Sequence, residues 1–527
     1  MRYIITVMVA LLFLALAAPA AAGQCDDPVN TAEGQVLGKT SGPACAWLGV
    51  PYAAPPTGHG RFRPPAPAYT RTHLFAATDF GPACVQNESI SSGGKSKTMS
   101  EDCLTLNIFR PQKSGSFPVM FWIHGGAFTQ GAGSYEMYDG SALAGTQDVV
   151  VVTINYRLGP FGFLALPELT GEDGAVGAGN YGLLDQIAAL EWVRDNIANF
   201  GGDPKNVTIF GESAGGVSVC ALLASGPAAG LFHRAIMESG ACDMTESLPD
   251  GYTAGRKLAA ELGCPADDAR DCLRKLSAAT ILKAAKKMSA SAHLDGKVLT
   301  DQPVNLIRAG TWNQVPVMTG STRDEMAMLI YLKPWAGCLS RRRVEDAIRK
   351  TVPKRADDIL GMYKFEDYGR PVRVFGAIIA DAFGSRALAL AQVASPAQPV
   401  YWYRFDWDEE RGSKIAGSFH GLELPFVFGN LELKNSPLGL LMKKKGLPEA
   451  RKLSAAMMAY WANFARAGNP NGQGLPEWKP FTAEDPERIV LDTTITAGRP
   501  QADEWKRLSY YARVALSEFD LSAVMGK

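Results

Sequence analysis

Short runs of consecutive apolar residues recur along the chain and limit its fold more than any other feature. They cover residues 118–123, 149–155, 207–210, 315–319 and 400–405. A strand that is apolar at every position needs cover on both of its faces. A segment with helical periodicity, residues 182–197, lies between two of these runs. The pattern predicts an α/β fold in which helices cover both faces of a large, mostly parallel central sheet.

One apolar run leads directly into a serine that lies between two glycines. The run 207–210 is followed by Gly211-Glu212-Ser213-Ala214-Gly215 and then by small residues that favour a helix start. G-x-S-x-G at a strand-to-helix turn holds a nucleophilic serine on a strained elbow. We expect that a side chain at Gly211 or Gly215 would clash with the neighbouring strand and helix. Five-residue matches also arise by chance, so Ser213 needs a base, an acid and oxyanion donors elsewhere.

The base must be one of six histidines. In the α/β-hydrolase arrangement the acid and then the histidine follow the serine in the chain. This order excludes the earlier histidines, which are His59, His73 and His124. His233 lies too soon after Ser213 to leave room for an acid-bearing strand, and no strand leads into His293. His420 follows the run 400–405 in a glycine-flanked loop, so we assign it as the base rather than as a surface residue.

The acid should follow a strand between Ser213 and His420. The run 315–319 leads to Asp324 and Glu325, which are adjacent. Spacing cannot decide between the two carboxylates, and a solvated pair of loop residues is the alternative for both.

Oxyanion donors should come from the residue after the nucleophile and from a glycine-rich loop after an early strand. Ala214 supplies the first backbone N–H group. Gly125 and Gly126 follow the run 118–123 and supply the second site, although such a pair is often only a turn. We expect His124, which precedes them, to be structural.

The charge balance excludes several classes of partner. The chain has 53 Lys and Arg against 53 Asp and Glu, so it has no electrostatic footprint for nucleic acid or for an anionic membrane. It contains no P-loop, no dinucleotide-binding fingerprint and no His or Cys set with zinc spacing. We therefore expect a small-molecule substrate and neither a cofactor nor a metal.

The N-terminus has the pattern of an export signal. Arg2 precedes an apolar run, and small residues follow it up to Gly23, so we predict a signal peptide over residues 1–22 with cleavage after Ala22. A membrane anchor is the alternative, but the run is short. We predict a single domain over residues 23–527, secreted or periplasmic and without a membrane anchor.

Nine cysteines agree with an oxidising compartment. Cys84 and Cys103 flank one polar loop, and Cys264 and Cys272 flank another, so we predict a disulfide across each. Cys25 and Cys45 form a candidate third pair. The odd number leaves at least one cysteine unpaired, and the sequence does not fix the connectivity.

Several long motifs in order make the chain similar to the type-B carboxylesterases, a family that includes the cholinesterases. They lie at residues 48–56, 101–109, 180–186, 200–215, 420–429 and 460–466. The resemblance spans nearly the whole mature chain. It implies an α/β-hydrolase fold and ester hydrolysis, and it implies that Glu325 is the triad acid. It also supports His420 as the base and the Cys84–Cys103 and Cys264–Cys272 pairs.

The chain departs from the family at two places. Met326 stands where the family usually has glycine after the acid, which raises a question about that loop. The Cys84–Cys103 loop contains no tryptophan, whereas cholinesterases place one there to hold quaternary ammonium. We therefore do not expect choline esters as physiological substrates.

Together these features predict a secreted serine carboxylic ester hydrolase with a Ser-His-Glu triad and an acyl-enzyme intermediate. Thioester, lactone and amide hydrolysis use the same machinery and stay open. A non-catalytic cholinesterase-like binding protein is the alternative from another class, but such proteins lose triad residues. The run 326–331 has two interpretations, a lining of the substrate gorge or a core helix.

Overall fold

The structure is a computed structural model that describes residues 24–87, 98–170, 179–331, 333, 336–409, 417–434 and 446–514. The predicted signal peptide and residues 88–97 of the loop between Cys84 and Cys103 lie outside the described residues.

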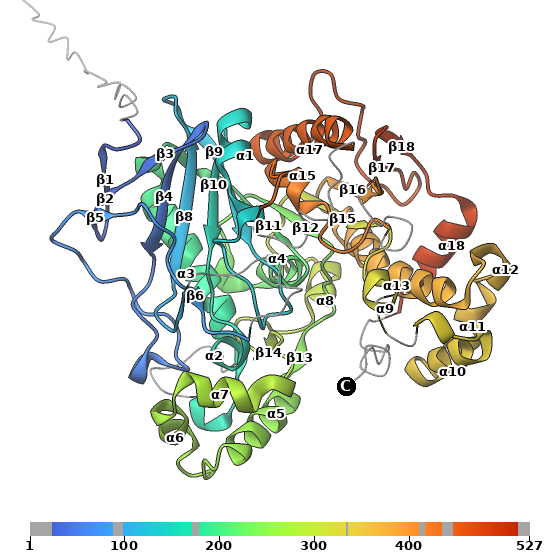
Figure 1. Cartoon of the computed structure of the whole chain (residues 1–527), viewed down its shortest axis with the longest axis horizontal. Helices are drawn as coiled ribbons and strands as arrows, with labels where there is room; N and C mark the ends of the chain where they lie inside the picture. The colour runs from blue at the N-terminus through green and yellow to red at the C-terminus, as the bar shows by residue number, and fades with distance from the viewer. Residues whose placement is uncertain are drawn as a thin grey trace, which may run out of the picture.

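A large mixed sheet runs through the described chain (Figure 1). Its strands are β3 (Lys39–Ser41), β4 (Ala44–Pro51), β8 (Thr105–Pro111), β9 (Phe117–Ile123), β10 (Val150–Ile154), β11 (Gly202–Glu212), β12 (Arg234–Glu238), β15 (Val317–Thr322), β16 (Val400–Phe405), β17 (Arg488–Leu491) and β18 (Thr496–Gly498). Their spatial order is β18-β17-β16-β15-β12-β11-β9-β10-β8-β4-β3. The strands from β10 to β17 in this order are parallel, and antiparallel strands extend both edges. Each of the five apolar runs overlaps one of these strands, as predicted.

Helices cover both faces of the sheet. The covering helices are α1 (Ser141–Gln147), α3 (Tyr181–Asn196), α4 (Ala214–Ala224), α13 (Pro371–Ala394), α15 (Leu424–Phe428) and α17 (Leu447–Ala467). Phe121 of β9 packs in one core with residues of α3, α4 and α13. Its neighbour Trp122 packs in a second core with residues of α1, α15 and α17. Successive strand residues therefore enter opposite cores, which explains why the runs are apolar at every position.

Two groups of helices are inserted between the strands, and Figure 1 shows the first at the bottom of the view and most of the second at the right. The first group follows β12 and contains α5 (Leu248–Glu261), α6 (Ala269–Lys275) and α7 (Ala278–Ala284); the second follows β15 and contains α9 (Ala327–Tyr331), α10 (Arg341–Thr351), α11 (Ala356–Gly361) and α12 (Phe365–Tyr368). The second group packs against α13 and α18 (Ala502–Tyr511) in a core of its own, which includes Ile330 of α9. This packing favours the core-helix interpretation of residues 326–331.

The described chain also contains shorter strands and α-helices. They are β1 (Pro28–Thr31), β2 (Gly34–Leu37), β5 (Phe75–Ala76), β6 (Ala83–Cys84), β7 (Met99–Ser100), β13 (Glu246–Ser247), β14 (His293–Leu294), α2 (Gly159–Phe163) and α8 (Pro303–Arg308). Strands β1, β2 and β5 form a small separate sheet.

Four disulfides tie the chain together. The pairs Cys25–Cys45, Cys84–Cys103 and Cys264–Cys272 confirm the prediction. A fourth disulfide, Cys220–Cys242, was not predicted and joins α4 to the loop after β12. Cys338 is free and exposed.

Among the described helices, only α13 is long and apolar enough to cross a membrane by length and composition. Its most apolar window is 78% buried inside the protein. This burial agrees with a core helix.

Candidate active site

The predicted site residues follow four parallel strands. Ser213 follows β11, Gly125 and Gly126 follow β9, Glu325 follows β15, and His420 follows β16. The carboxyl ends of parallel strands lie at one edge of a sheet, where functional groups of α/β proteins gather. The topology therefore brings these four loops to the same edge.

The serine elbow is tightly packed. Ser213 has φ 58° and ψ −123°, outside the conformations that ordinary residues favour, and α4 begins at the next residue. A Cβ atom added to Gly215 would lie 2.0 Å from the carbonyl oxygen of Ile123, and one added to Gly211 would lie 2.6 Å from that of Gly215. A side chain at either glycine would therefore clash with neighbouring backbone atoms, as predicted.

The glycine loop after β9 lies directly against the elbow. A Cβ atom added to Gly125 would lie 3.1 Å from the Cβ atom of Ser213 and 2.7 Å from the carbonyl oxygen of Glu212. Gly126 has φ +110°, which favours glycine. These contacts place the loop backbone beside the serine, close to Ala214 at the start of α4. Backbone N–H groups in such a place can stabilise an oxyanion.

His420 contacts the second carboxylate of the Asp-Glu pair. Its Nδ1 atom lies 2.5 Å from Oε2 of Glu325. The other oxygen of Glu325 accepts hydrogen bonds from the Thr322 N–H group (2.8 Å) and the Ser239 hydroxyl (2.7 Å). Asp324 instead accepts from the backbone of Ser418. The structure therefore brings Glu325 to the imidazole.

The Nε2 atom of His420 lies 3.1 Å from Oε1 of Glu212, the residue before the serine. No hydrogen bond between His420 and Ser213 is found, although the structure describes both residues. Burial lowers the pKa of His420, but the carboxylates of Glu212 and Glu325 outweigh burial and raise it to about 10. Hydrogen bonds of a catalytic base are often long without substrate and tighten when it binds.

Sequence reasoning missed three buried carboxyl groups near His420. Burial raises the pKa of Glu212 to about 7 and that of Glu238 to about 8. Burial also raises the pKa of Glu423, and the neighbouring carboxylates raise it further. Glu212 and Glu423 lie inside the quoted motifs, so a signal was present, but the motifs do not show that these groups share one buried cluster.

Three other histidines have structural contacts. His124 stacks on Tyr156, and burial lowers its pKa to about 4, which agrees with the expected structural role. His233 accepts a hydrogen bond from the N–H group of Val207, and His293 lies 3.0 Å from the carbonyl oxygen of Phe163. Within the described ranges, no group of three or more His, Cys, Asp or Glu side chains is arranged to hold a metal ion.

Met326, the departure after the acid, fits its position. The backbone strain of this loop lies at Glu325, which has φ 21°, while Met326 is not among the described residues with a positive φ. Its side chain is partly buried against the core of the second helical group. This position therefore does not require the glycine that is usual in the resembled family.

Comparison with known proteins shows the family of the chain. A model of the carboxylesterase family matches residues 26–507. The chain belongs to the carboxylesterase family. It is thus a carboxylic ester hydrolase with the α/β-hydrolase fold.

Similar carboxylesterases cover nearly the whole chain. The para-nitrobenzyl esterase of Bacillus subtilis (strain 168) is 38% identical over 91% of this chain and 98% of the relative. Liver carboxylesterase 1 of Oryctolagus cuniculus is 36% identical over 93% and 94% of the two chains. The solved structure of a carboxylesterase from Geobacillus stearothermophilus, at pH 6.2, is 35% identical with a TM-score of 0.81 over 92% of this chain and 100% of the other.

Proposed function

We propose that this carboxylesterase hydrolyses uncharged small esters through an acyl-enzyme on Ser213, with His420 as the base and Glu325 as the acid. The observation that carries the proposal is the 2.5 Å contact between Glu325 and His420 at the sheet edge that holds the strained elbow. Glu325 holds the imidazole tautomer and compensates its positive charge during the reaction.

In the proposed reaction, Nε2 of His420 takes the proton of the Ser213 hydroxyl as its oxygen attacks the ester carbonyl. The N–H groups of Gly125, Gly126 and Ala214 bind the oxyanion, and each donor contributes about 3–4 kcal/mol in the enzymes where one has been removed. His420 then gives its proton to the leaving alcohol. Water repeats the sequence on the acyl-enzyme and releases the acid.

Two variants test the triad with a small aryl ester. We expect Ser213→Ala to lower kcat by about 10⁶-fold, as loss of the nucleophile does in another triad enzyme. We expect Glu325→Gln to lower kcat by about 10⁴-fold, because the amide keeps the size of the carboxylate but loses its charge. Ser218→Ala, on the same helix start as the elbow, is the matched control and should stay within a few-fold of wild type.

Near-normal hydrolysis by Ser213→Ala, with an unchanged circular dichroism spectrum, would exclude this serine as the nucleophile. If Glu325→Gln retains wild-type turnover, the acid lies elsewhere. The same assay with a thioester, a lactone and an amide of equal acyl length separates ester hydrolysis from its alternatives. Absence of hydrolysis by the wild-type enzyme would favour a binding protein.

We also propose that the enzyme is exported. The signal pattern of residues 1–22 supports export, and the four disulfides are compatible with an oxidising compartment.

A further inference from the structure

The two loops that carry Glu325 and His420 pair with one another through their backbones. The N–H group of Asp324 donates to the carbonyl oxygen of Ser418 (2.9 Å), and that of His420 donates to the carbonyl oxygen of Glu325 (3.1 Å). A parallel bridge joins Glu325 and Phe419 between these bonds. The two loops follow β15 and β16, which pair with one another in parallel. The position of His420 therefore depends on how the two loops are held together.

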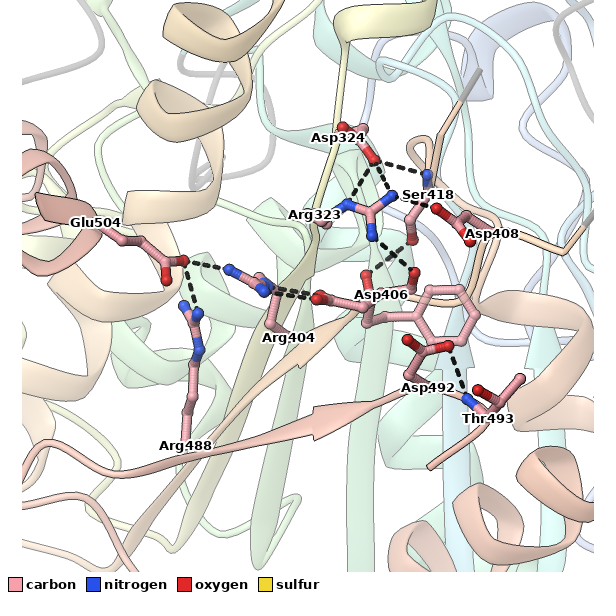
Figure 2. Close-up of polar contacts among 11 residues, drawn as sticks. Arg323, Asp324, Arg404, Asp406, Asp408, Ser418, Arg488, Asp492, Thr493 and Glu504 are labelled. Atoms are coloured by element: carbon pink, nitrogen blue, oxygen red, sulfur yellow. Dashed lines mark hydrogen bonds and ion pairs between the residues drawn. The ribbon is translucent and has the colours of Figure 1, made fainter. Parts of the chain in front are cut away.

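The side chain of Asp324 adds a second contact to the same peptide. The N–H group of Ser418 donates to Oδ2 of Asp324 (2.8 Å; Figure 2). Together with the backbone bond, Asp324 thus binds both backbone polar groups of Ser418. Ser418 is fully buried, and its hydroxyl donates to the carbonyl oxygen of Phe405 (2.8 Å). At Gly417, which has φ +58°, an added Cβ atom would lie 2.3 Å from Oδ2 of Asp324. A glycine is needed here for the carboxylate to reach the loop.

Arg323 holds the carboxylate of Asp324 in place. Its guanidinium donates to Oδ2 of Asp324 (2.9 Å) and to Oδ2 of Asp408 (2.8 Å), and more weakly to the carbonyl oxygen of Asp406 (3.3 Å). Burial lowers the pKa of Arg323, but the neighbouring Asp324 and Asp408 outweigh burial and raise it above the usual value. Figure 2 shows Arg323 between the two carboxylates. A charged guanidinium thus fixes the direction in which Asp324 faces Ser418.

We propose that Asp324 is a positioning residue, whose carboxylate fixes the Ser418 peptide and thereby sets the imidazole of His420 against Glu325. The proposal rests on the proposed role of His420 as the base. Asp324 contacts His420 only through the loop, so its loss displaces the imidazole but removes no reacting group. A displacement of about 1 Å can lower an enzymatic rate by about 100-fold.

Three variants distinguish the contact of Asp324 with Ser418 from its contact with Arg323. Asp324→Ala removes both the acceptor for Ser418 and the charge beside Arg323, whereas Asp324→Asn keeps an acceptor. Asp408→Asn is the matched control, because it weakens the hold on Arg323 and leaves the Ser418 contact intact. We expect Asp324→Ala to lower kcat by about 10- to 100-fold with little change in KM. Asp324→Asn should recover most of this loss, and Asp408→Asn should resemble wild type.

Covalent labelling distinguishes positioning from a general loss of folded protein. An uncharged organophosphate is added to each variant, and both the labelled fraction and the rate constant of labelling are measured. We expect Asp324→Ala to be labelled completely but more slowly than wild type. The proposal would be overturned if Asp324→Ala were labelled with the rate constant of wild type. This holds whether labelling is complete or incomplete, because incomplete labelling at that rate constant indicates a loss of folded protein. Labelling away from Ser213, or wild-type labelling of His420→Ala, would instead overturn the triad and this proposal with it.

Discussion

At the scale of single residues, His420 lies between two carboxylates with different tasks. Glu325 binds Nδ1, the nitrogen that stays protonated when the histidine acts as a base. Glu212 faces Nε2, the nitrogen that must be free to take the serine proton. Both carboxylates stabilise the imidazolium, so both raise the pKa of His420. Because only the neutral imidazole accepts a proton, a high pKa restricts activity at low pH.

Glu212→Gln should therefore extend activity toward acidic pH. Removal of the negative charge beside Nε2 lowers the pKa of His420, and the histidine then stays neutral at lower pH. We expect the acidic limb of kcat/KM to move down by about one pH unit or more. The measurement is steady-state hydrolysis of an uncharged aryl ester from pH 6 to pH 11, which spans the pKa of His420.

Glu238→Gln is the matched control for this change. Glu238 is equally buried, but its carboxyl accepts a hydrogen bond from Trp461 (2.6 Å), and burial raises its pKa to about 8. The carboxylates that raise the pKa of His420 are Glu212, Glu325 and Glu423, so an amide at Glu238 should leave the acidic limb where it is. An unmoved limb in Glu212→Gln, or a limb moved upward, would contradict the electrostatic account.

The sequence contained most of the candidate site but not its electrostatics. The order of serine, acid and histidine was enough to select His420, because each residue follows an apolar run that proved to be a strand. The choice of Glu325 over Asp324 needed a family resemblance, since adjacent residues differ only in direction. The burial of Glu212, Glu238 and Glu423 could not be predicted from the sequence, because it depends on packing between segments that are distant in the chain.

At the scale of elements, the strand-to-helix elbow shows how backbone packing supports the site. The elbow lies against the end of β9, and Gly215 approaches the backbone of Ile123 directly. Backbone atoms cannot move aside as a flexible side chain can. The N–H group of Ala214, a proposed oxyanion donor, lies between the serine and this contact.

Gly215→Ala should therefore reduce both stability and turnover. Its methyl group would lie 2.0 Å from a carbonyl oxygen, and forced overpacking costs about 1–3 kcal/mol of unfolding free energy. The shift of α4 should also lower kcat for an aryl ester. Gly226→Ala is the control, because an added Cβ atom there meets nothing within 4 Å. Equal melting temperatures and turnover for the two variants would refute this packing argument.

The elements themselves were predictable to different degrees. The strands at the centre of the sheet were predictable from the sequence, because helices cover both faces and the strands are therefore unbroken apolar runs. The inserted helices α5–α7 and α10–α12 were not predicted from the sequence, since they pack in small satellite cores. The Cys220–Cys242 disulfide was missed because Cys220 lies within a helix and flanks no loop.

At the scale of the whole molecule, the cysteine pattern and the N-terminal pattern lead to one experiment. Export followed by cleavage after Ala22 should give a product of residues 23–527. We expect one cysteine, Cys338, to react with an alkylating reagent in denaturant before reduction, and all nine to react after reduction. Intact-mass analysis of the exported protein measures both properties. Retention of residues 1–22, or two or more reactive cysteines before reduction, would contradict the prediction. The single domain over 23–527 stays a prediction.

The order of the disulfides bears on how the chain is assembled in the cell. Each bond joins two cysteines that are consecutive in the sequence, and no bond encloses another. When the chain emerges N-terminus first, the second cysteine of each pair appears after its partner. At that moment the partner is the one earlier cysteine that has not yet formed a disulfide. An oxidase that joins thiols in order of appearance produces the native set among the 105 pairings that eight cysteines permit. Under that order of oxidation the native set forms without an isomerase, and Cys338 arrives last, with every earlier thiol already joined.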